Sequence, residues 1–144
     1  MLGTPNRLEH DQGFFVKNGD GSADLKPIAH LYKTQVYAMA RHLGLPEAVC
    51  TAAPTTDTYS LNQGQDEFYF GLPYAQMDMA LWAHNHSVPV AELAAALHLR
   101  VEQADLIYAD IEAKRSATQY LHARALMVEP VTGLTELTSG HAPG

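Results

Sequence analysis

The side chains best suited to chemistry are concentrated between residues 13 and 24, in the stretch GFFVKNGDGSAD. A lysine and two aspartates lie there on a glycine-rich bend, together with an asparagine and a serine. Counted from residue 18, four oxygen-bearing residues occupy positions 1, 3, 5 and 7 of a calcium-binding EF-hand loop. That loop also requires a glycine at position 6 and a glutamate at position 12. Ala23 and Ala29 stand at those two positions, so the stretch is not predicted to bind calcium.

Further reactive side chains flank this stretch on both sides. Over residues 3–35 the candidates are Thr4, Glu9, Lys17, Asp20, Asp24 and Lys33. Carboxylate oxygens suit the hard Mg²⁺ ion, and ammonium groups offset the charge that develops on phosphates during reaction. The residue types are therefore those of a magnesium–nucleotide site. Composition alone also leaves open a solvated surface turn capped by the two aspartates.

The bulk composition is typical of a soluble globular protein. The chain has 144 residues, of which 47% are hydrophobic and 17% charged, which predicts one domain with a single modest core. A formal net charge of −7 disfavours non-specific binding to nucleic acid, which depends on lysine and arginine. The single cysteine, Cys50, predicts a reducing, cytoplasmic setting. The sequence contains neither a long apolar run nor a secretory leader, so we expect no membrane span.

Hydrophobic spacing predicts a mainly helical chain. We expect helices over residues 29–43, from Pro73 onward, over 89–97 and over 101–122. On the last helix, the residues expected to form one apolar stripe are Val101, Ala104, Tyr108 and Ile111. Residues 1–27 are expected to be loop, with strand candidates only at the N-terminus. Residues 51–66 lack periodicity and are expected to form a long, mobile loop of the kind that closes over a site.

The order of the residues resembles that of the NAD⁺ synthetase family. The run GTPNRLEHDQGFFVKNGDGSADLKPIAHLYKTQV is similar to the family pattern G-T-x-N-x-x-E, then G-[FY]-F-x-K-x-G-D-G-x-x-D-x-x-P, then K-x-Q. The similarity continues through LGLPEAV, APTTD and GQDEFYFGLPYAQMDMAL, and it covers residues 3–83 closely.

The resemblance implies an α/β, Rossmann-like ATP-pyrophosphatase fold for the complete protein, assembled as a homodimer. This mainly α-helical chain would be the C-terminal part of the synthetase domain, with residues 132–144 as a flexible tail after the domain residues 1–131. The implied enzyme is a cytoplasmic ligase that uses ATP, Mg²⁺ and ammonia to convert deamido-NAD⁺ to NAD⁺. The nicotinate carboxylate is first adenylated with release of pyrophosphate, and ammonia then displaces AMP from the deamido-NAD adenylate.

The resemblance also implies roles for individual side chains. The residues expected to bind ATP are Thr4, Lys33 and Thr55. The residues expected to bind deamido-NAD⁺ are Lys17, Asp24 and His122. Glu9 is expected to bind Mg²⁺, and the expected catalytic residues are Asp20 and Lys33. Closure of the loop that carries Thr55 would exclude water, because an acyl-adenylate is otherwise hydrolysed.

The chain departs from the family pattern in three places. The pyrophosphate loop S-G-G-x-D-S is absent, so we expect the chain to be incomplete and inactive alone. The family's His-Lys-Arg run corresponds to His122-Ala123-Arg124, without the lysine. Val16 and Asn18 stand where threonine and tyrosine are common in the family. The sequence contains no glutaminase segment, which leaves ammonia and glutamine both open as the nitrogen source.

Two alternative functions compete with the synthetase interpretation. One is a synthetase-like module that binds nucleotide without catalysis. The other is DNA binding by residues 87–115, where two short helices joined at LHLR are similar to a helix-turn-helix. The sequence HNH at residues 84–86 could hold a metal, but it is interpreted as a helix-capping turn because no third ligand lies nearby in the sequence. Cys50 is interpreted as a packed small hydrophobe.

Overall fold

The computed structural model describes residues 1–54, 71–124, 126, 128 and 129. Thr55, with most of the predicted loop 51–66, lies outside the described residues, as does the predicted tail 132–144. The backbone of Asp20 is described, but its side chain is not.

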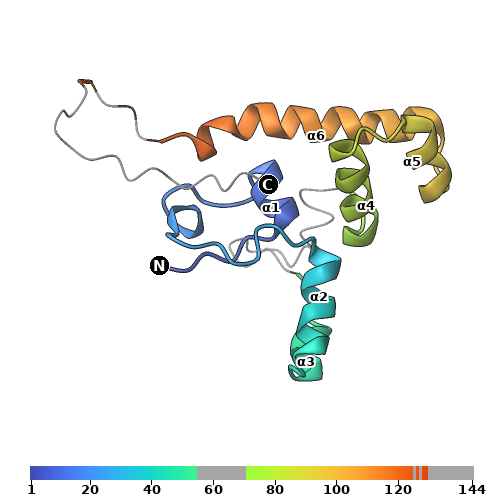
Figure 1. The fold of residues 1–144 in the computed structure, drawn as a ribbon. Helices are drawn as coiled ribbons and strands as arrows, with labels where there is room; N and C mark the ends of the chain where they lie inside the picture. Colours follow the sequence, from blue (N-terminus) through green and yellow to red (C-terminus); the bar gives the residue numbers. More distant parts are fainter. Residues whose placement is uncertain (55–70, 125, 127, 130–144) are drawn as a thin grey trace.

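The described part of the chain is helical, as predicted (Figure 1). The helices are α1 (Arg7–Gln12), α2 (Lys33–His42), α3 (Glu47–Cys50), α4 (Tyr74–Asn85), α5 (Val90–Leu97) and α6 (Val101–His122), with a short 3-10 turn at Asp20–Ser22. No strand forms within the described ranges. A single parallel bridge joins Leu2 to Leu25, at the N-terminal segment where strand candidates were expected.

Helix α1 contradicts the expectation that residues 1–27 are loop. The Asn6 side chain accepts hydrogen bonds from the backbone N–H groups of Leu8 and Glu9, at 2.9 and 3.1 Å. The Glu9 side chain in turn accepts one from the Asn6 backbone at 2.9 Å, which completes a capping box. Gly13 ends the helix in the left-handed conformation, with φ of 73°. Reciprocal capping therefore stabilises a helix too short to show hydrophobic periodicity.

The remaining helices differ from the predicted ranges mainly at their first residues. Helix α2 begins at Lys33 rather than residue 29, because residues 26–31 form turns closed by bonds such as Leu31 N–H to Ile28 O at 2.9 Å. Pro73 and Pro89 are the N-caps of α4 and α5, one position before the helix proper. The range of α6 agrees with the prediction, and α3 was not predicted.

The core lies where α1, α4, α5 and α6 meet. Its fully buried side chains include Leu8, Met77, Leu81, Leu93, Ala104 and Ile111. Val101 was expected in the same stripe as Ala104 and Ile111, but it is half exposed at the first turn of α6. Leu8 is the α1 residue in this core, so α1 is anchored to the helical bundle by a buried leucine as well as by polar contacts.

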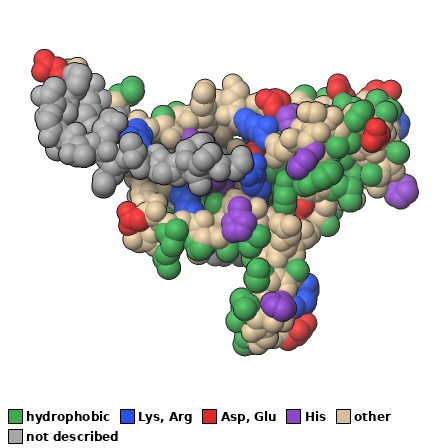
Figure 2. Space-filling view, in the orientation of Figure 1, with side chains coloured by type: hydrophobic (Ala, Val, Ile, Leu, Met, Phe, Trp, Pro, Cys, Tyr) green, Lys and Arg blue, Asp and Glu red, His purple; other side chains and the backbone are tan. Residues whose placement is uncertain are grey.

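Helices α2 and α3 project from the rest of the molecule, while α6 runs along its opposite side (Figure 1). Figure 2 shows hydrophobic side chains on the surface of this projection. Its exposed hydrophobic residues are Met39, Leu43, Leu45 and Val49. Cys50 is 2% exposed, which confirms that it is a packed residue. Among the described helices, none is long and apolar enough to cross a membrane.

Candidate functional site

Glu9 and Lys33 meet between α1 and α2, although they are far apart in the sequence. The Lys33 Nζ lies 3.9 Å from the Glu9 Oε1, and the two side chains are 19% and 13% exposed. The Lys33 ammonium also lies over the rings of Tyr37 and Tyr74, at 5.8 and 5.5 Å from their centroids. The structure thus brings together the predicted metal ligand and the predicted ATP-binding lysine.

Asp78 fixes the start of α2 from the neighbouring helix α4. Its carboxylate accepts hydrogen bonds from the backbone N–H groups of Lys33 and Thr34, at 3.3 and 2.8 Å. Asp78 is buried, and burial raises the pKa of its carboxyl, although these hydrogen bonds oppose the rise. Asp78 was not predicted as a site residue. The available signal was a carboxylate directly after Met77, on the face of α4 that turns toward the core.

Basic side chains line a second part of the site, a pocket of about 500 Å³. The charged and titratable residues that line it are His10, Lys17, Lys26, His122 and Arg124. Two predicted residues for deamido-NAD⁺, Lys17 and His122, therefore meet here from opposite ends of the chain. Among the described residues that line the pocket, none is acidic, so its chemistry suits an anionic ligand.

Neighbouring groups hold the two predicted residues in this pocket. The Lys17 ammonium donates a hydrogen bond to the Tyr120 carbonyl at 2.6 Å, near the end of α6. The His122 ring packs edge-on against His10 and Phe15, with centroid distances of 5.0 and 5.3 Å. Burial lowers the pKa of His10, and the nearby Lys26 and His122 lower it further. His10 and Lys26 were not predicted, and the available signal was a nitrogen-bearing side chain directly after Glu9 and two residues after Asp24.

Two further predicted residues, Asp24 and Thr4, are not among the described residues that line this pocket. Asp24 is exposed and forms an ion pair with the amino group of Met1. Thr4 is exposed in the segment that leads into α1. Of the two substituted positions beside Lys17, Asn18 lines the pocket and Val16 is 67% exposed.

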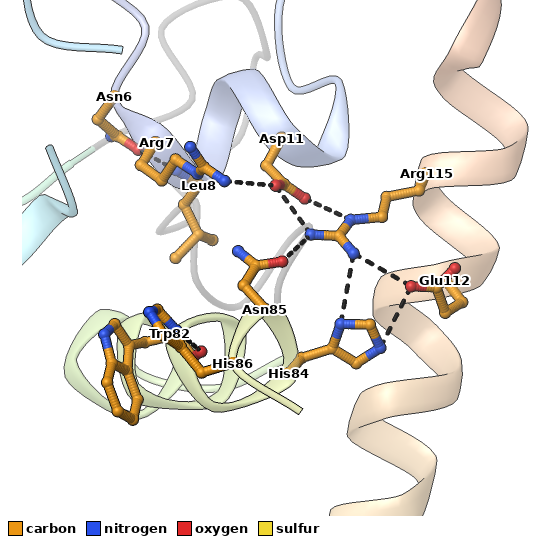
Figure 3. Close-up of polar contacts among 10 residues, drawn as sticks. All are labelled: Asn6, Arg7, Leu8, Asp11, Trp82, His84, Asn85, His86, Glu112 and Arg115. Carbon is orange, nitrogen blue, oxygen red and sulfur yellow. Dashed lines mark hydrogen bonds and ion pairs between the residues drawn. The ribbon is translucent and has the colours of Figure 1, made fainter. Parts of the chain in front are cut away.

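The HNH segment at residues 84–86 ends helix α4. His86 is the C-cap, its Nδ1 lies 2.7 Å from the Trp82 carbonyl oxygen, and its ring stacks on Trp82 at 4.2 Å (Figure 3). This confirms the capping interpretation for His86. His84 instead contacts Glu112, with 3.2 Å between Nε2 and Oε1. Across the described ranges, no three His, Cys, Asp or Glu side chains are grouped so that they could hold a metal ion.

Arg115 on α6 joins three helices in a network that was not predicted (Figure 3). Its Nε and Nη2 donate to the two carboxylate oxygens of Asp11 on α1, at 2.7 and 2.9 Å. Nη2 also donates to the side-chain oxygen of Asn85, and Nη1 donates to Glu112 at 3.1 Å. Nη1 lies 3.3 Å from the His84 Nδ1. Because arginine has no acceptor, the Nδ1 must accept, which leaves the proton of neutral His84 on Nε2, facing Glu112.

Comparison with known proteins identifies relatives over most of the chain. A family model described as NAD synthase matches residues 1–121. The NH(3)-dependent NAD(+) synthetase of Rhizobium meliloti strain 1021 is 60% identical over 131 residues, covering 91% of this chain and 39% of that protein. The protein of the same description from Mesorhizobium japonicum is 57% identical over 127 residues, covering 88% of this chain and 40% of that protein. The chain therefore spans about two fifths of the length of these curated relatives.

The fold is similar to that of a solved structure titled NMN synthetase, from Francisella tularensis. The TM-score is 0.62 at 24% identity, over 88% of this chain and 45% of the other. The similarity supports a shared fold. The family match also includes residues 87–115, where α5 and α6 pack through the buried Leu93, Leu97 and Ala104. The segment that was similar to a helix-turn-helix thus lies within the family match and packs into the core of this chain.

Proposed function

This chain belongs to the NAD synthase family, and on that premise we propose that it is the C-terminal part of an ammonia-dependent NAD⁺ synthetase. The proposed reaction is the ATP-dependent amidation of deamido-NAD⁺. The nicotinate carboxylate attacks the α-phosphorus of ATP and pyrophosphate leaves. Ammonia then attacks the acyl carbon, and AMP leaves with the oxygen that formed the new bond. The relatives are described as ammonia-dependent, which favours ammonia over glutamine as the nitrogen source.

The observation that supports the proposal most directly is the position of α1, which contacts both Lys33 and the basic pocket. Glu9 on this helix lies beside Lys33, and the next residue, His10, lines the pocket that contains Lys17 and His122. A carboxylate, a lysine and a basic pocket thus converge on one turn of helix. This arrangement supports binding of a nucleoside triphosphate next to an anionic dinucleotide.

On the ATP side, we propose that Lys33 binds phosphate. Its ammonium would offset charge as pyrophosphate departs, an interaction that strengthens in the transition state. Asp78 accepts a hydrogen bond from the Lys33 backbone at the start of α2, which fixes the position from which the lysine side chain extends. Thr4 and Thr55 are proposed to contribute further ATP contacts, and Asp20 to lie near the reacting carboxylate.

The donor chemistry of Glu9 fits a magnesium site with one protein ligand. Mg²⁺ in nucleotide enzymes takes one or two carboxylates and fills its other positions with water and phosphate oxygens. Glu9 supplies one carboxylate in a largely buried position beside a phosphate-binding lysine. When bound, the ion would neutralise phosphate charge and orient the triphosphate. Glu9 also keeps its hydrogen bond from the Asn6 backbone, which holds its orientation.

On the dinucleotide side, we propose that Lys17 and His122 bind deamido-NAD⁺ in the basic pocket. The presence of Lys26 and Arg124 in the lining supports binding of the dinucleotide's phosphates there. Asp24 is proposed to join them.

The complete protein is proposed to have a Rossmann-like ATP-pyrophosphatase fold, with the S-G-G-x-D-S loop outside this chain. Within this chain, residues 1–131 are proposed to belong to the synthetase domain, followed by a tail over residues 132–144. We also propose a cytoplasmic homodimer. The exposed hydrophobic residues on the α2–α3 projection would be covered by a second copy or by the remainder of the polypeptide.

The proposal is tested with the complete protein, meaning the longer polypeptide of which this chain is proposed to be a part. NAD⁺ formation is measured with deamido-NAD⁺, ATP, Mg²⁺ and ammonium, and each substrate is omitted in turn. We expect formation of NAD⁺ with one AMP and one pyrophosphate for each turnover. Binding of both nucleotides without formation of NAD⁺ would contradict the proposal and favour a non-catalytic binding module.

A further inference from the structure

We infer that Arg115 is a positioning residue for this reaction, because it holds helix α1 in the orientation that presents Glu9 to Lys33. The inference rests on the proposed function. Arg115 does not line the basic pocket, and its guanidinium is bonded to Asp11 on α1, so it would act through that residue.

The geometry of α1 makes its orientation depend on Asp11. The helix has six residues, well below the length of about 12 to 15 at which an isolated helix becomes even marginally stable. Successive residues turn by about 100°, so residues two apart leave the helix in nearly opposite directions, about 200° apart. Glu9 and Asp11 stand in that relation. Helix α1 is therefore held between Lys33 of α2 on one side and Arg115 of α6 on the other.

The contact between Arg115 and Asp11 fixes the rotation of α1 about its axis as well as its distance from α6. Two nitrogens of one planar guanidinium donate to two oxygens of one carboxylate, a bidentate pair that defines the relative orientation of the groups. The Asp11 side chain is 10% exposed, and Arg7 approaches the same carboxylate at 3.6 Å. A rotation of α1 about its axis would break this fork and carry Glu9 away from Lys33.

Helix α4 contacts both Arg115, which binds α1, and the backbone of Lys33. Arg115 is tied to α4 through Asn85 and His84 (Figure 3). Lys33 is tied to the same helix through Asp78. Arg115 thus links the position of α1 to the helix that also sets the start of α2, which is the function expected of a positioning residue rather than of an isolated surface ion pair.

The test is a double-mutant cycle in the complete protein between Arg115→Lys and Glu9→Gln. Lysine keeps the positive charge but cannot donate the two-pronged fork. We expect Arg115→Lys to lower kcat for NAD⁺ formation about tenfold or more, the scale of a small misplacement of reacting groups. In the Glu9→Gln background the same change should lower kcat less than about twofold, because both substitutions disturb one function. Asp110→Asn on the exposed face of α6 is the matched control, and it should leave kcat unchanged.

Each outcome of the cycle bears on the inference. Equal fold-changes in both backgrounds, or an unchanged kcat for Arg115→Lys, would overturn it. If Arg115→Lys does not fold, Asp11→Asn replaces it in the same cycle with the same expectation, because it removes the charge from the other half of the fork. A protein without substitutions that forms no NAD⁺ would overturn the proposed function, and this inference with it.

Discussion

The carboxylate of Glu9 and the ammonium of Lys33 lie 3.9 Å apart at the junction of α1 and α2. Glu9 has a second task, because its other oxygen caps the Asn6 backbone N–H. A substitution of Glu9 therefore affects the charge of the site and the stability of α1 together, and the two effects must be separated by the choice of variant.

Glu9→Gln removes the charge but retains an oxygen that can complete the capping box. We expect this variant to need at least about tenfold more Mg²⁺ for half-maximal rate, since it weakens the proposed metal ligand. Its thermal midpoint should stay close to that of the parent. Glu9→Ala should show the same kinetic defect with an additional loss of about 1 kcal/mol in stability, because the hydrogen bond from the Asn6 backbone to the Glu9 side chain is lost as well. An unchanged Mg²⁺ requirement in Glu9→Gln would remove Glu9 from the metal role.

Gly13 allows α1 to approach α6 closely, and its replacement should be costly. A Cβ at this position would overlap the side chain of Thr118, and φ is +73°. Gly44 has a similar φ of +68°, but a Cβ added there would meet no atom within 4 Å among the described residues, so Gly44→Ala is the matched control. Both alanine variants should lose about 1 to 2 kcal/mol from the left-handed backbone. Gly13→Ala should lose more stability than Gly44→Ala because of the overlap with Thr118. Urea unfolding of the complete protein measures both losses. Equal losses in the two variants would show that Thr118 moves away freely.

Asp78 should make the stability of the protein depend on pH in a defined direction. Burial raises the pKa of its carboxyl above the ordinary value of 3.8. Between the ordinary and the raised pKa, the folded protein binds a proton that the unfolded chain has lost. The stabilising contribution is therefore complete below pH 3.8 and is lost as the pH rises through the raised pKa.

The measurement compares the parent with Asp78→Asn, which has no carboxyl to titrate. We expect the free energy of unfolding of the parent, minus that of the variant, to decrease as the pH rises from 3.8 toward neutrality. Urea unfolding at a series of pH values gives this difference. A difference that increases with pH would mean that hydrogen bonds from Lys33 and Thr34 outweigh burial and lower the pKa instead.

Lys17 and His122 should affect the binding of deamido-NAD⁺ more than the binding of ATP. We expect Lys17→Met and His122→Ala each to raise the KM for deamido-NAD⁺ about tenfold, the cost of losing one hydrogen bond to a charged group. The KM for ATP should change much less. His42→Ala, an exposed histidine at the end of α2, is the control for loss of an imidazole. A rise in both KM values, or in the KM for ATP alone, would place these side chains elsewhere in the site.

The sequence predicted the long helices better than the short ones, for a physical reason. Helix α6 has enough turns for hydrophobic periodicity to define its ends, and its predicted range agrees with the structure. Helix α1 has no such periodicity, and its signal was the polar pair Asn6 and Glu9. Glu9 was interpreted only as a metal ligand, and Asn6 was assigned no role. Glu9 both completes the capping box and is the proposed metal ligand, and the sequence pattern alone does not separate these two roles.

Candidate site residues were predicted only where they match a position of the family pattern. The pattern placed Glu9, Lys33, Lys17 and His122 as candidates, and the structure brings them together in two pairs. Asp78 and Arg115 act on other residues rather than on a ligand, so their importance depends on which helices become neighbours. Hydrophobic spacing predicts the faces of helices but not these long-range polar contacts.

The proposed adenylate intermediate is tested most directly by isotope labelling in the protein without substitutions. Deamido-NAD⁺ labelled with ¹⁸O in its nicotinate carboxylate is incubated with the complete protein, ATP, Mg²⁺ and ammonium, and the AMP is analysed by mass spectrometry. Because the carboxylate attacks the α-phosphorus and AMP later leaves with that oxygen, we expect AMP that carries one labelled oxygen for each NAD⁺ formed. Unlabelled AMP alongside newly formed NAD⁺ would contradict the proposed reaction.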